Sequence, residues 1–240
     1  STPTDKAAVE LLETLDVGAY KVGSDDLVYT PFLQYVADKG KPVIIATGMA
    51  QMSDVDRAVE TIEAQGATGQ AVILHCISQY PTPENAVNLR RIETLRERFP
   101  QCVVGFSDHS WGITSALGAV ALGAAVVEKH FTLDNDMPGP DHRFSANPQQ
   151  LTDMVREIRK LEASLGSGEI VMSKADQEMA DLCHRSIYAA RDLAAGAQLS
   201  EDDFVYQRPG TGLMPYHTGD LVGKRLNAGV AKGEAMRLDM

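Results

Sequence analysis

Positive charge, cysteine and long apolar segments are all scarce in this chain. Its 240 residues include 22 Lys and Arg against 33 Asp and Glu, which gives a formal net charge of −11. Nucleic acids and anionic membrane surfaces attract basic proteins, so this charge argues against both as partners. The sequence has no run of about 18 apolar residues and no basic leader followed by an apolar run, so we expect neither a membrane span nor export.

The three cysteines, Cys76, Cys102 and Cys183, lie far apart in the sequence. Their odd number does not suit a disulfide framework, and their spacing does not suit a zinc knuckle. We therefore expect a cytoplasmic protein in a reducing compartment.

What the chain does contain is a regular alternation of short apolar segments and amphipathic helical segments. This pattern predicts βα units around a parallel sheet, with ligands bound at the carboxyl ends of the strands. We expect strands over 19–22, 43–46, 71–74, 103–106 and 125–127. We expect helices over 55–65 with Ser53 and Asp54 as the cap, over 89–99, and over 149–165 with Asn147 at the start and Gly166 at the end.

The character of the sequence changes after Gly168. Residues 169–183 are polar and helical in pattern, and we expect a linker there. Short strand-like pieces interrupted by glycine follow, which is typical of a small β-rich module. The expected domains are therefore 1–168, the linker 169–183 and the module 184–240.

Two histidines occupy matching places after successive strands, His109 in Ser107-Asp108-His109 and His130 in Glu128-Lys129-His130. Imidazole suits borderline divalent cations, so the two histidines are predicted to be a pair of metal ligands. Asp108, Glu128 and Asp141 are the nearby carboxylates that would supply oxygen ligands or fix the ring tautomers.

Several other residues allow both a functional and a structural interpretation. Lys21 precedes Gly23-Ser24 and is expected to point into a site, although a strand-end lysine also reaches solvent easily. Tyr80-Pro81-Thr82-Pro83 suits a rigid turn as well as a site. His142 suits a substrate contact or a supporting role, and Arg208-Pro209-Gly210 is by itself only a turn signal. We expect His75 to be a packed structural residue, and His184 and His217 to lie on the surface.

Taken together and in this order, the motifs resemble the N-acetylneuraminate (sialic acid) synthase family from Ser1 to Met240. They are Lys21-Val22-Gly23-Ser24, Thr47-Gly48-Met49, Leu74-His75-Cys76, Tyr80-Pro81-Thr82-Pro83, Ser107-Asp108-His109, Glu128-Lys129-His130, Gly139-Pro140-Asp141-His142 and Arg208-Pro209-Gly210. The resemblance implies a (β/α)8 TIM-type barrel followed by a small antifreeze-like (SAF) domain. It also implies condensation of phosphoenolpyruvate with N-acetylmannosamine and water to N-acetylneuraminate and phosphate, with Mn2+ or Mg2+ as cofactor and a domain-swapped homodimer as the working assembly.

The resemblance also assigns roles to individual residues. His109 and His130 would bind the metal, and Lys21 and Asp26 would be catalytic. The substrate-binding set would be Thr2, Ser24, Ser78, Tyr80, Ser107, Asp141, His142 and Arg208. Three positions depart from the family, since Asp25 replaces a common glycine, Ala46 a hydroxyl residue and Ser78 an asparagine of some members. These departures predict a weaker phosphate cradle.

Other functions are compatible with parts of this pattern. A sister synthase of legionaminic or pseudaminic acid would use the same chemistry on a related sugar. A metal-dependent aldolase or hydrolase would keep the histidines without needing Lys21 and Ser24. A non-catalytic carbohydrate-binding module is the third alternative.

Five strands do not close a barrel of eight. By comparison with the family, Ser1-Thr2-Pro3 corresponds to the end of the third strand, so we expect only the last five βα units. An open barrel exposes strand edges, and we expect the chain alone to lack turnover.

Overall fold

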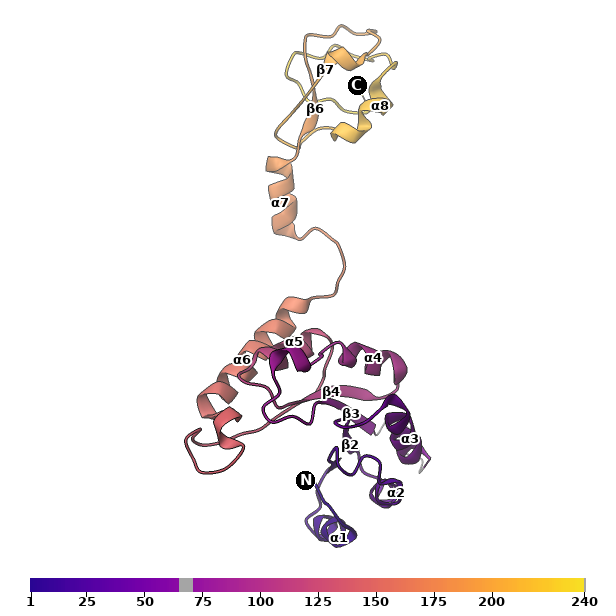
Figure 1. Ribbon diagram of the computed structural model, residues 1–240. Helices are drawn as coiled ribbons and strands as arrows, with labels where there is room; N and C mark the ends of the chain where they lie inside the picture. The colour runs from indigo at the N-terminus through magenta and orange to yellow at the C-terminus, as the bar shows by residue number, and fades with distance from the viewer. Residues whose placement is uncertain (65–70, 240) are drawn as a thin grey trace. The chain divides into compact units, whose positions relative to one another are not determined.

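The computed structural model describes residues 1–64 and 71–239. The chain divides into two compact units, Ser1–Ser167, called the sheet unit, and Gly168–Met240, called the small unit (Figure 1). Within the described residues, no helix combines the length and apolar character needed to cross a membrane.

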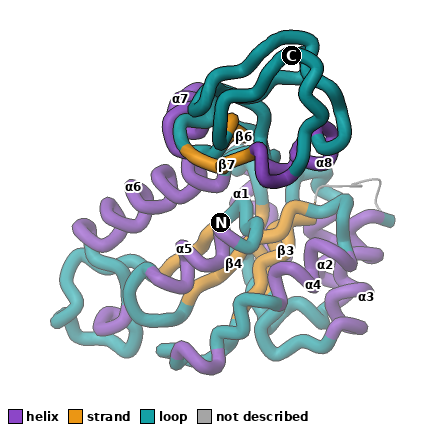
Figure 2. Tube along the Cα trace, turned by 90° about the horizontal axis from the view of Figure 1, so that it is seen from above, coloured by secondary structure: helices purple, strands orange, loops and turns teal. Residues whose placement is uncertain are grey.

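The sheet unit is built on five parallel strands in the order β1-β2-β3-β4-β5. Their bounds are β1 Tyr20–Val22, β2 Val43–Ala46, β3 Ala71–Cys76, β4 Val103–Asp108 and β5 Val127–Lys129. The helices are α1 Lys6–Thr14, α2 Thr30–Ala37, α3 Met52–Glu63, α4 Arg91–Arg98, α5 Thr114–Ala121 and α6 Pro148–Leu165, with short 3-10 turns at Glu84–Ala86 and His142–Phe144. The helices lie along one side of a curled, half-barrel sheet (Figures 1 and 2).

The predicted five parallel strands are confirmed, and so is the open sheet. Within the described residues, β1 and β5 have no further strand on their outer edges. Next to β1, the Lys21 backbone N–H donates to the Ser1 carbonyl at 2.8 Å, so the first residues run beside the edge strand.

Successive side chains of each strand in the sheet unit point to opposite faces of the sheet. Tyr20, Val43, Ile73, Val104 and Phe106 are buried among the helices in one core cluster. Their neighbours in sequence point to the concave side, because side chains alternate across a strand. This alternation decides which residues of each strand face the site.

Several predicted boundaries are wrong. Strands β3 and β4 continue two residues further than expected, because His75 pairs with Phe106 and Cys76 with Ser107. Strand β5 begins at Val127 rather than at residue 125, since its register is fixed by pairing with Phe106.

Helix α3 also begins earlier than predicted, with Gln51 rather than Ser53 or Asp54 as its N-cap. Asp54 instead lies at the third helical position, where its carboxylate accepts the Gln51 backbone N–H at 3.0 Å. A carboxylate near a helix start stabilises it from either position, so composition did not distinguish them.

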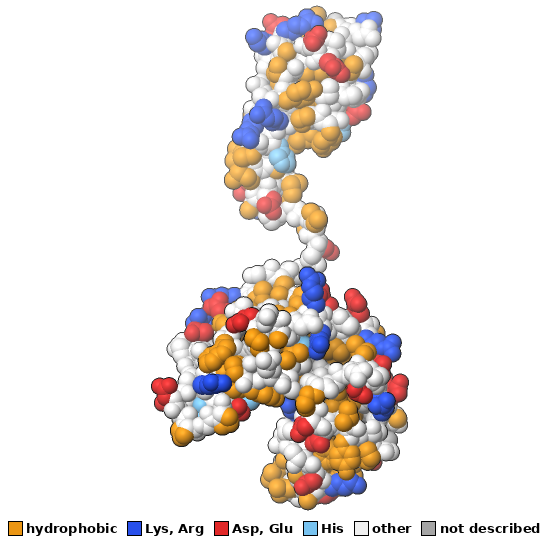
Figure 3. All heavy atoms as spheres, viewed as in Figure 1, with side chains coloured by type: hydrophobic (Ala, Val, Ile, Leu, Met, Phe, Trp, Pro, Cys, Tyr) orange, Lys and Arg blue, Asp and Glu red, His pale blue; other side chains and the backbone are white. Residues whose placement is uncertain are grey.

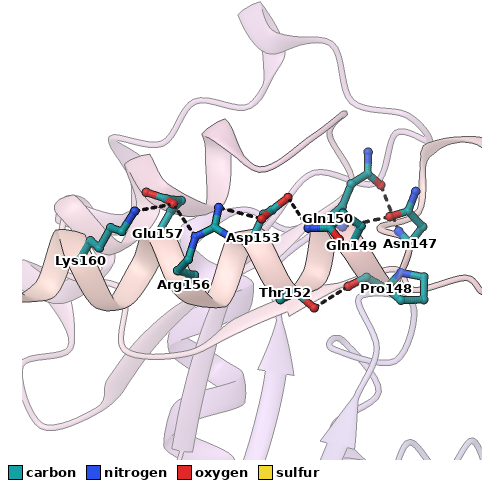
Figure 4. Close-up of polar contacts among 9 residues, drawn as sticks. All are labelled: Asn147, Pro148, Gln149, Gln150, Thr152, Asp153, Arg156, Glu157 and Lys160. Atoms are coloured by element: carbon teal, nitrogen blue, oxygen red, sulfur yellow. Dashed lines mark hydrogen bonds and ion pairs between the residues drawn. The ribbon is translucent and has the colours of Figure 1, made fainter.

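Helix α6 has the predicted Asn147 cap and ends as predicted at Gly166 with φ +60, but it begins at Pro148, one residue before the predicted start. The Asn147 side chain accepts the Gln150 backbone N–H at 2.9 Å, and the Gln150 side chain accepts the Asn147 N–H at 3.0 Å. Along the exposed face, Arg156 bridges Asp153 and Glu157 (Figure 4). These contacts stabilise the long helix that covers α5.

Replacing Asn147 with Ala is expected to destabilise the sheet unit by about 1 kcal/mol, because the cap and its reciprocal bond are both lost. Asn147→Asp keeps the acceptor and serves as the control. Denaturant unfolding followed by the fluorescence of Trp111, the single tryptophan, measures the difference. Equal stability of the Ala and Asp variants would contradict this account of the helix start.

The small unit contains α7 Lys174–Cys183, the antiparallel strands β6 Ser186–Ala189 and β7 Phe204–Gln207, and the short helix α8 Thr218–Leu221, with 3-10 turns at Glu201–Asp203 and Pro215–His217. Isolated bridges such as Leu193 with Val230 connect its loops. Its own core gathers Ile187, Phe204 and Met236. Helix α7 falls within the segment predicted as a helical linker. On the face of each unit seen in Figure 3, acidic and basic side chains are interspersed.

Candidate active site

A cavity of about 430 Å³ lies at the carboxyl ends of the five strands. Every strand, or the loop that follows it, contributes to its wall. The lining residues are Lys21, Gly23, Ser24, Asp25, Ala46, Met49, Cys76, Ser78, Tyr80, Ser107, His109, Glu128 and His130. The cavity therefore occupies the place where parallel α/β folds bind ligands.

The register of β4 and β5 places two similar tripeptides side by side. Ser107 pairs with Glu128 and Asp108 with Lys129, so His109 and His130 follow at matching positions. Because side chains alternate, the first and third residue of each tripeptide face the cavity and the middle residues face away.

The two histidine rings meet at the cavity. Their centroids are 5.1 Å apart and the rings stand edge to face at 82°. Tyr80 packs over His109 at 4.2 Å between centroids, and the buried ring of Phe144 lies 5.2 Å from that of His130. The histidines are thus held by an aromatic wall on one side.

The hydrogen bonding of His109 fixes its tautomer. Its Nδ1 lies 2.8 Å from the Ile77 carbonyl oxygen, which only accepts, so Nδ1 carries the proton and Nε2 keeps its lone pair. Burial lowers the pKa of His109 below its ordinary value of 6.5. A neutral ring with a free Nε2 is the form that binds a metal.

These two rings fit a shared cation. A metal–nitrogen distance of about 2.1 Å puts an ion ~3 Å from a ring centre, so two rings on one ion stand ~4.5–5.5 Å apart. In residues 1–64 and 71–239, however, no group of three or more His, Cys, Asp and Glu side chains is arranged to hold a metal. An ion here would have two protein nitrogens, with water or substrate completing its coordination.

The charges of the cavity wall also favour a cation. The formally charged lining groups are the ammonium of Lys21 and the carboxylates of Asp25 and Glu128, which give a formal charge of −1 when the histidines are counted as neutral. A cavity of this charge repels an anionic substrate unless a cation is present. A divalent ion would change the formal charge of the cavity from negative to positive.

Lys21 lines the cavity beside Glu128 and Ser107. Its Nζ is 3.1 Å from Glu128 Oε1, and Ser107 Oγ donates to the same oxygen at 2.7 Å. The Lys21 side chain is only one-fifth exposed. Lys21 and Ser107 are therefore placed as donors at one spot in the cavity, with Glu128 as their present acceptor.

A close approach of backbone and hydroxyl groups forms the floor of the cavity. The Gly48 backbone N–H donates to Ser24 Oγ at 3.0 Å. A β-carbon at Gly48 would lie 2.2 Å from Ser78 Oγ and 2.6 Å from Ser24 Oγ, so only glycine fits. Ser78 Oγ is buried and has no hydrogen-bond partner of good geometry among the described residues. It is a free donor for a bound anion.

Seven of the twelve residues predicted from the sequence line this cavity. They are Lys21, Ser24, Ser78, Tyr80, Ser107, His109 and His130. Asp141 lies at its margin, with Oδ2 3.7 Å from His130 Nδ1. Burial of the Tyr80 hydroxyl raises its pKa, which keeps that group a neutral donor.

The remaining four residues are not in the lining. Thr2 is exposed, and His142 is paired with Thr132, whose hydroxyl lies 2.7 Å from Nδ1. The Asp26 side chain is outside the lining, although burial and the charge of Asp25 raise its pKa. Arg208 is exposed in the small unit, directly after β7.

The sequence gives no individual role at this site to Gly48, Cys76 or Phe144. It predicts Glu128 as an oxygen ligand or an acceptor for a histidine ring, whereas in the structure Glu128 accepts from Lys21 and Ser107. The alternation of side chains along a strand places Glu128 on the same face as His130. Gly48 belongs to the motif Thr47-Gly48-Met49, but its close approach to two hydroxyls depends on the fold.

The prediction that His75 is structural agrees with its surroundings. Its side chain is fully buried, its Nε2 donates to the Val87 carbonyl at 2.7 Å and its ring stacks on Phe106. Burial lowers the pKa of His75 below 6.5, and the positive charge of Arg91 adds to this. The folded state therefore disfavours the protonated ring.

This shift gives a pH dependence. Below about pH 6.5 the unfolded chain protonates His75 more readily than the folded chain, so stability is complete above that pH and falls as the pH decreases. We expect the parent to lose up to about 1.4 kcal/mol per pH unit relative to His75→Gln, which keeps a donor but does not titrate. Unfolding followed by Trp111 at pH 7.5 and 5.5 measures this, and parallel curves would contradict it.

Comparisons with known proteins agree with this geometry. Residues 1–170 match the NeuB family and residues 184–240 match the SAF domain. The chain is 39% identical to N,N'-diacetyllegionaminic acid synthase of Legionella pneumophila, over 98% of this chain and 67% of the relative. It is 34% identical to N-acetylneuraminate-9-phosphate synthase of Homo sapiens, over 92% of this chain and 62% of the relative.

A crystal structure of a putative spore coat polysaccharide biosynthesis protein E from Chromobacterium violaceum is also similar. Its TM-score is 0.83 at 29% identity, with 98% of this chain and 71% of that chain covered. The chain spans about two thirds of the length of the curated relatives described above.

Proposed function

The chain belongs to the NeuB family and carries a SAF domain, and on this basis we propose that it acts in a phosphoenolpyruvate-dependent synthase of N-acetylneuraminate or a related sugar acid. One observation carries the proposal. A half-buried lysine, three serine hydroxyls and two histidines line a single cavity at the strand ends, and one of these histidines, His109, has a free Nε2. These are the groups that a phosphorylated carboxylate and a divalent cation need.

Phosphoenolpyruvate would be bound by Lys21 and the serine hydroxyls of the cavity. Lys21 Nζ would contact the phosphate or the carboxylate, and Ser24, Ser78 and Ser107 would donate their hydroxyls to its oxygens. Lys21 and Ser107 must then leave or share Glu128, which is their acceptor in this structure. The free hydroxyl of Ser78 needs no such exchange.

His109 and His130 would hold Mn2+ or Mg2+. The bound ion would supply Lewis-acid polarisation of the sugar aldehyde as negative charge develops on its oxygen. The chain itself orients the histidines, because the Ile77 carbonyl fixes the tautomer of His109 and Tyr80 packs over its ring. Tyr80 and Asp141 stand beside the pair, where the sugar would lie.

Two carboxylates are candidates for orienting the water that adds to the carbon bearing the phosphate. Glu128 lines the cavity but already accepts from Lys21 and Ser107, which weakens it as a base. Asp26 has a raised pKa and therefore a higher proton affinity. We propose that Asp26 takes the proton, which requires its side chain to turn into the cavity, and that Glu128 holds Lys21 and Ser107 in place.

The second substrate is a sugar, and relatives of this chain differ in the sugar acid that they are named for. Relatives named as synthases of diacetyllegionaminic acid, pseudaminic acid and N-acetylneuraminate 9-phosphate are 39%, 34% and 34% identical. We propose N-acetylmannosamine as substrate, with the precursors of legionaminic and pseudaminic acids as the alternatives. The choice rests on a few contacts worth about 1–3 kcal/mol each.

Release of inorganic phosphate from phosphoenolpyruvate tests the function. The assay uses this chain, and in a second arm the chain fused behind the first barrel units of a relative, with a panel of N-acetylated hexoses. We expect release only when phosphoenolpyruvate, a sugar and a divalent cation are all present. Release without a sugar would indicate a hydrolase, and cleavage of a sugar acid without phosphoenolpyruvate would indicate an aldolase; either result would overturn the proposal.

We further propose that the working assembly is a homodimer in which Arg208 of one chain closes over the sugar in its partner's cavity. Mixing an Arg208→Ala protein with a His109→Ala protein should then restore part of the activity, because one of the two cavities in the heterodimer is intact. The mixing is done with the active arm of the phosphate assay. Verified subunit exchange without recovery of activity would contradict the crossed arrangement.

A further inference from the structure

A buried ion pair lies directly behind the two histidines. Lys129 Nζ is 2.9 Å from Asp108 Oδ2, and the two side chains are 3% and 0% exposed. The pair joins β4 to β5 on the face of the sheet opposite the cavity. Asp108 precedes His109 in the sequence, and Lys129 precedes His130.

The pair continues into a network that includes the residue after His109. Asp108 Oδ1 accepts the backbone N–H of Ser110 at 2.8 Å and its hydroxyl at 2.7 Å. Lys129 Nζ also donates to the Ser110 carbonyl. The His109 carbonyl in turn accepts the Thr82 backbone N–H at 2.9 Å. The backbone on both sides of His109 is thereby fixed.

The network also fixes the register of the two strands at this point. A shift by one residue would move His109 or His130 to the face that carries the ion pair, because side chains alternate in strands. It would also bury Asp108 or Lys129 without its partner, which is strongly unfavourable. The charged pair therefore favours the register that places both imidazoles in the cavity.

Stability alone does not explain a charged pair at this position. Apolar residues of similar volume at a buried ion pair are often neutral or stabilising, since they avoid desolvation of the charges. The neighbouring outward positions Val104, Phe106 and Val127 are apolar, and an apolar pair would continue that core. Unlike an apolar pair, Asp108 and Lys129 provide directed hydrogen bonds next to the histidines.

We propose that Asp108, Lys129 and Ser110 form a positioning network that sets the separation and orientation of His109 and His130. This inference rests on the proposed metal role of the two histidines. The three residues face away from the cavity and touch neither substrate nor metal. They act through the strand register and the backbone of His109.

The test compares the parent chain with Lys129→Met and with the double variant Asp108→Leu/Lys129→Met. The double variant removes both charges, so it separates the loss of a buried pair from the loss of the hydrogen-bond network. Asp108→Asn keeps the acceptor for Ser110 and serves as the conservative variant. Arg191→Met is the matched control, because it removes the cation of another buried carboxylate, Asp203, in the small unit.

Two readouts are used on each folded variant. Mn2+ affinity is measured by electron paramagnetic resonance, and the tautomer of His109 is measured without metal from the 15N shifts of its ring. We expect the double variant to fold with a stability near that of the parent, yet to bind Mn2+ about 10- to 100-fold more weakly. In the double variant His109 should also lose its single Nδ1–H tautomer. Asp108→Asn should keep part of the Mn2+ affinity and part of the tautomer preference, and Arg191→Met should keep both in full.

Parental Mn2+ affinity and tautomer in the double variant would overturn the inference and leave the pair with a structural role only. If the parent itself does not bind Mn2+, the proposed metal site fails. The tautomer measurement then still decides whether the network orients His109.

Discussion

Replacing His109 or His130 with Ala is expected to lower the affinity for Mn2+ by more than about 100-fold. Changes in groups that only support a ligand already cost about 10- to 100-fold, and each histidine would be one of only two protein ligands. Within the described residues no third side chain of the His, Cys, Asp and Glu type is grouped with them to replace the lost nitrogen. Any synthase activity should disappear with the metal.

The control for this experiment is His184→Ala, since His184 is an exposed histidine of the small unit. Its replacement should leave Mn2+ binding unchanged. One Mn2+ per chain with parental affinity in His109→Ala would contradict the assignment of the histidine pair.

Replacing Gly48 with Ala is expected to have the next largest effect. The new β-carbon would lie 2.2 Å from Ser78 Oγ and 2.6 Å from Ser24 Oγ, so both hydroxyls must turn away from the cavity floor. A hydrogen bond to a charged group contributes about 1.5–3 kcal/mol. Loss of the hydrogen bond from one or both hydroxyls should weaken phosphoenolpyruvate binding at least about tenfold, while the sheet unit remains folded.

Gly18→Ala is the matched control for this substitution, because a β-carbon at Gly18 meets nothing within 4 Å. Calorimetric titration of both variants with phosphoenolpyruvate in the presence of Mn2+ compares them. Equal affinity of the two variants would show that the close approach at Gly48 has no part in binding.

The strands of the sheet could be predicted from the sequence because each is a short apolar run followed by polar residues. Strand β2 was placed without error, since a glycine-containing loop follows it directly. Strand β5 was placed two residues too early, because Ala125 and Val126 are as apolar as Val127. Only the pairing with β4 decides where the strand begins, and pairing is a property of the assembled sheet.

The candidate site was predictable to the extent that its groups follow strand ends. His109 and His130 directly follow strands, Lys21 and Ser107 are the last but one residues of theirs, and all four line the cavity. The role of Glu128 as acceptor for Lys21 required the register between distant strands. The proximity of Gly48 to Ser24 and Ser78 required loops that are separate in the sequence to meet, which no local pattern encodes.

The central claim is that the cavity binds phosphoenolpyruvate through Lys21 beside a divalent ion held by His109 and His130. Calorimetric titration of phosphoenolpyruvate into the purified chain tests it most directly, with Mn2+, after removal of Mn2+ by a chelator, and in the Lys21→Met variant with Mn2+. We expect binding with Mn2+ that is lost, or weakened by about tenfold or more, in each of the other two titrations, because the cavity wall alone is acidic. Failure of the parent chain to bind phosphoenolpyruvate with Mn2+, or equal binding in all three titrations, would contradict the account.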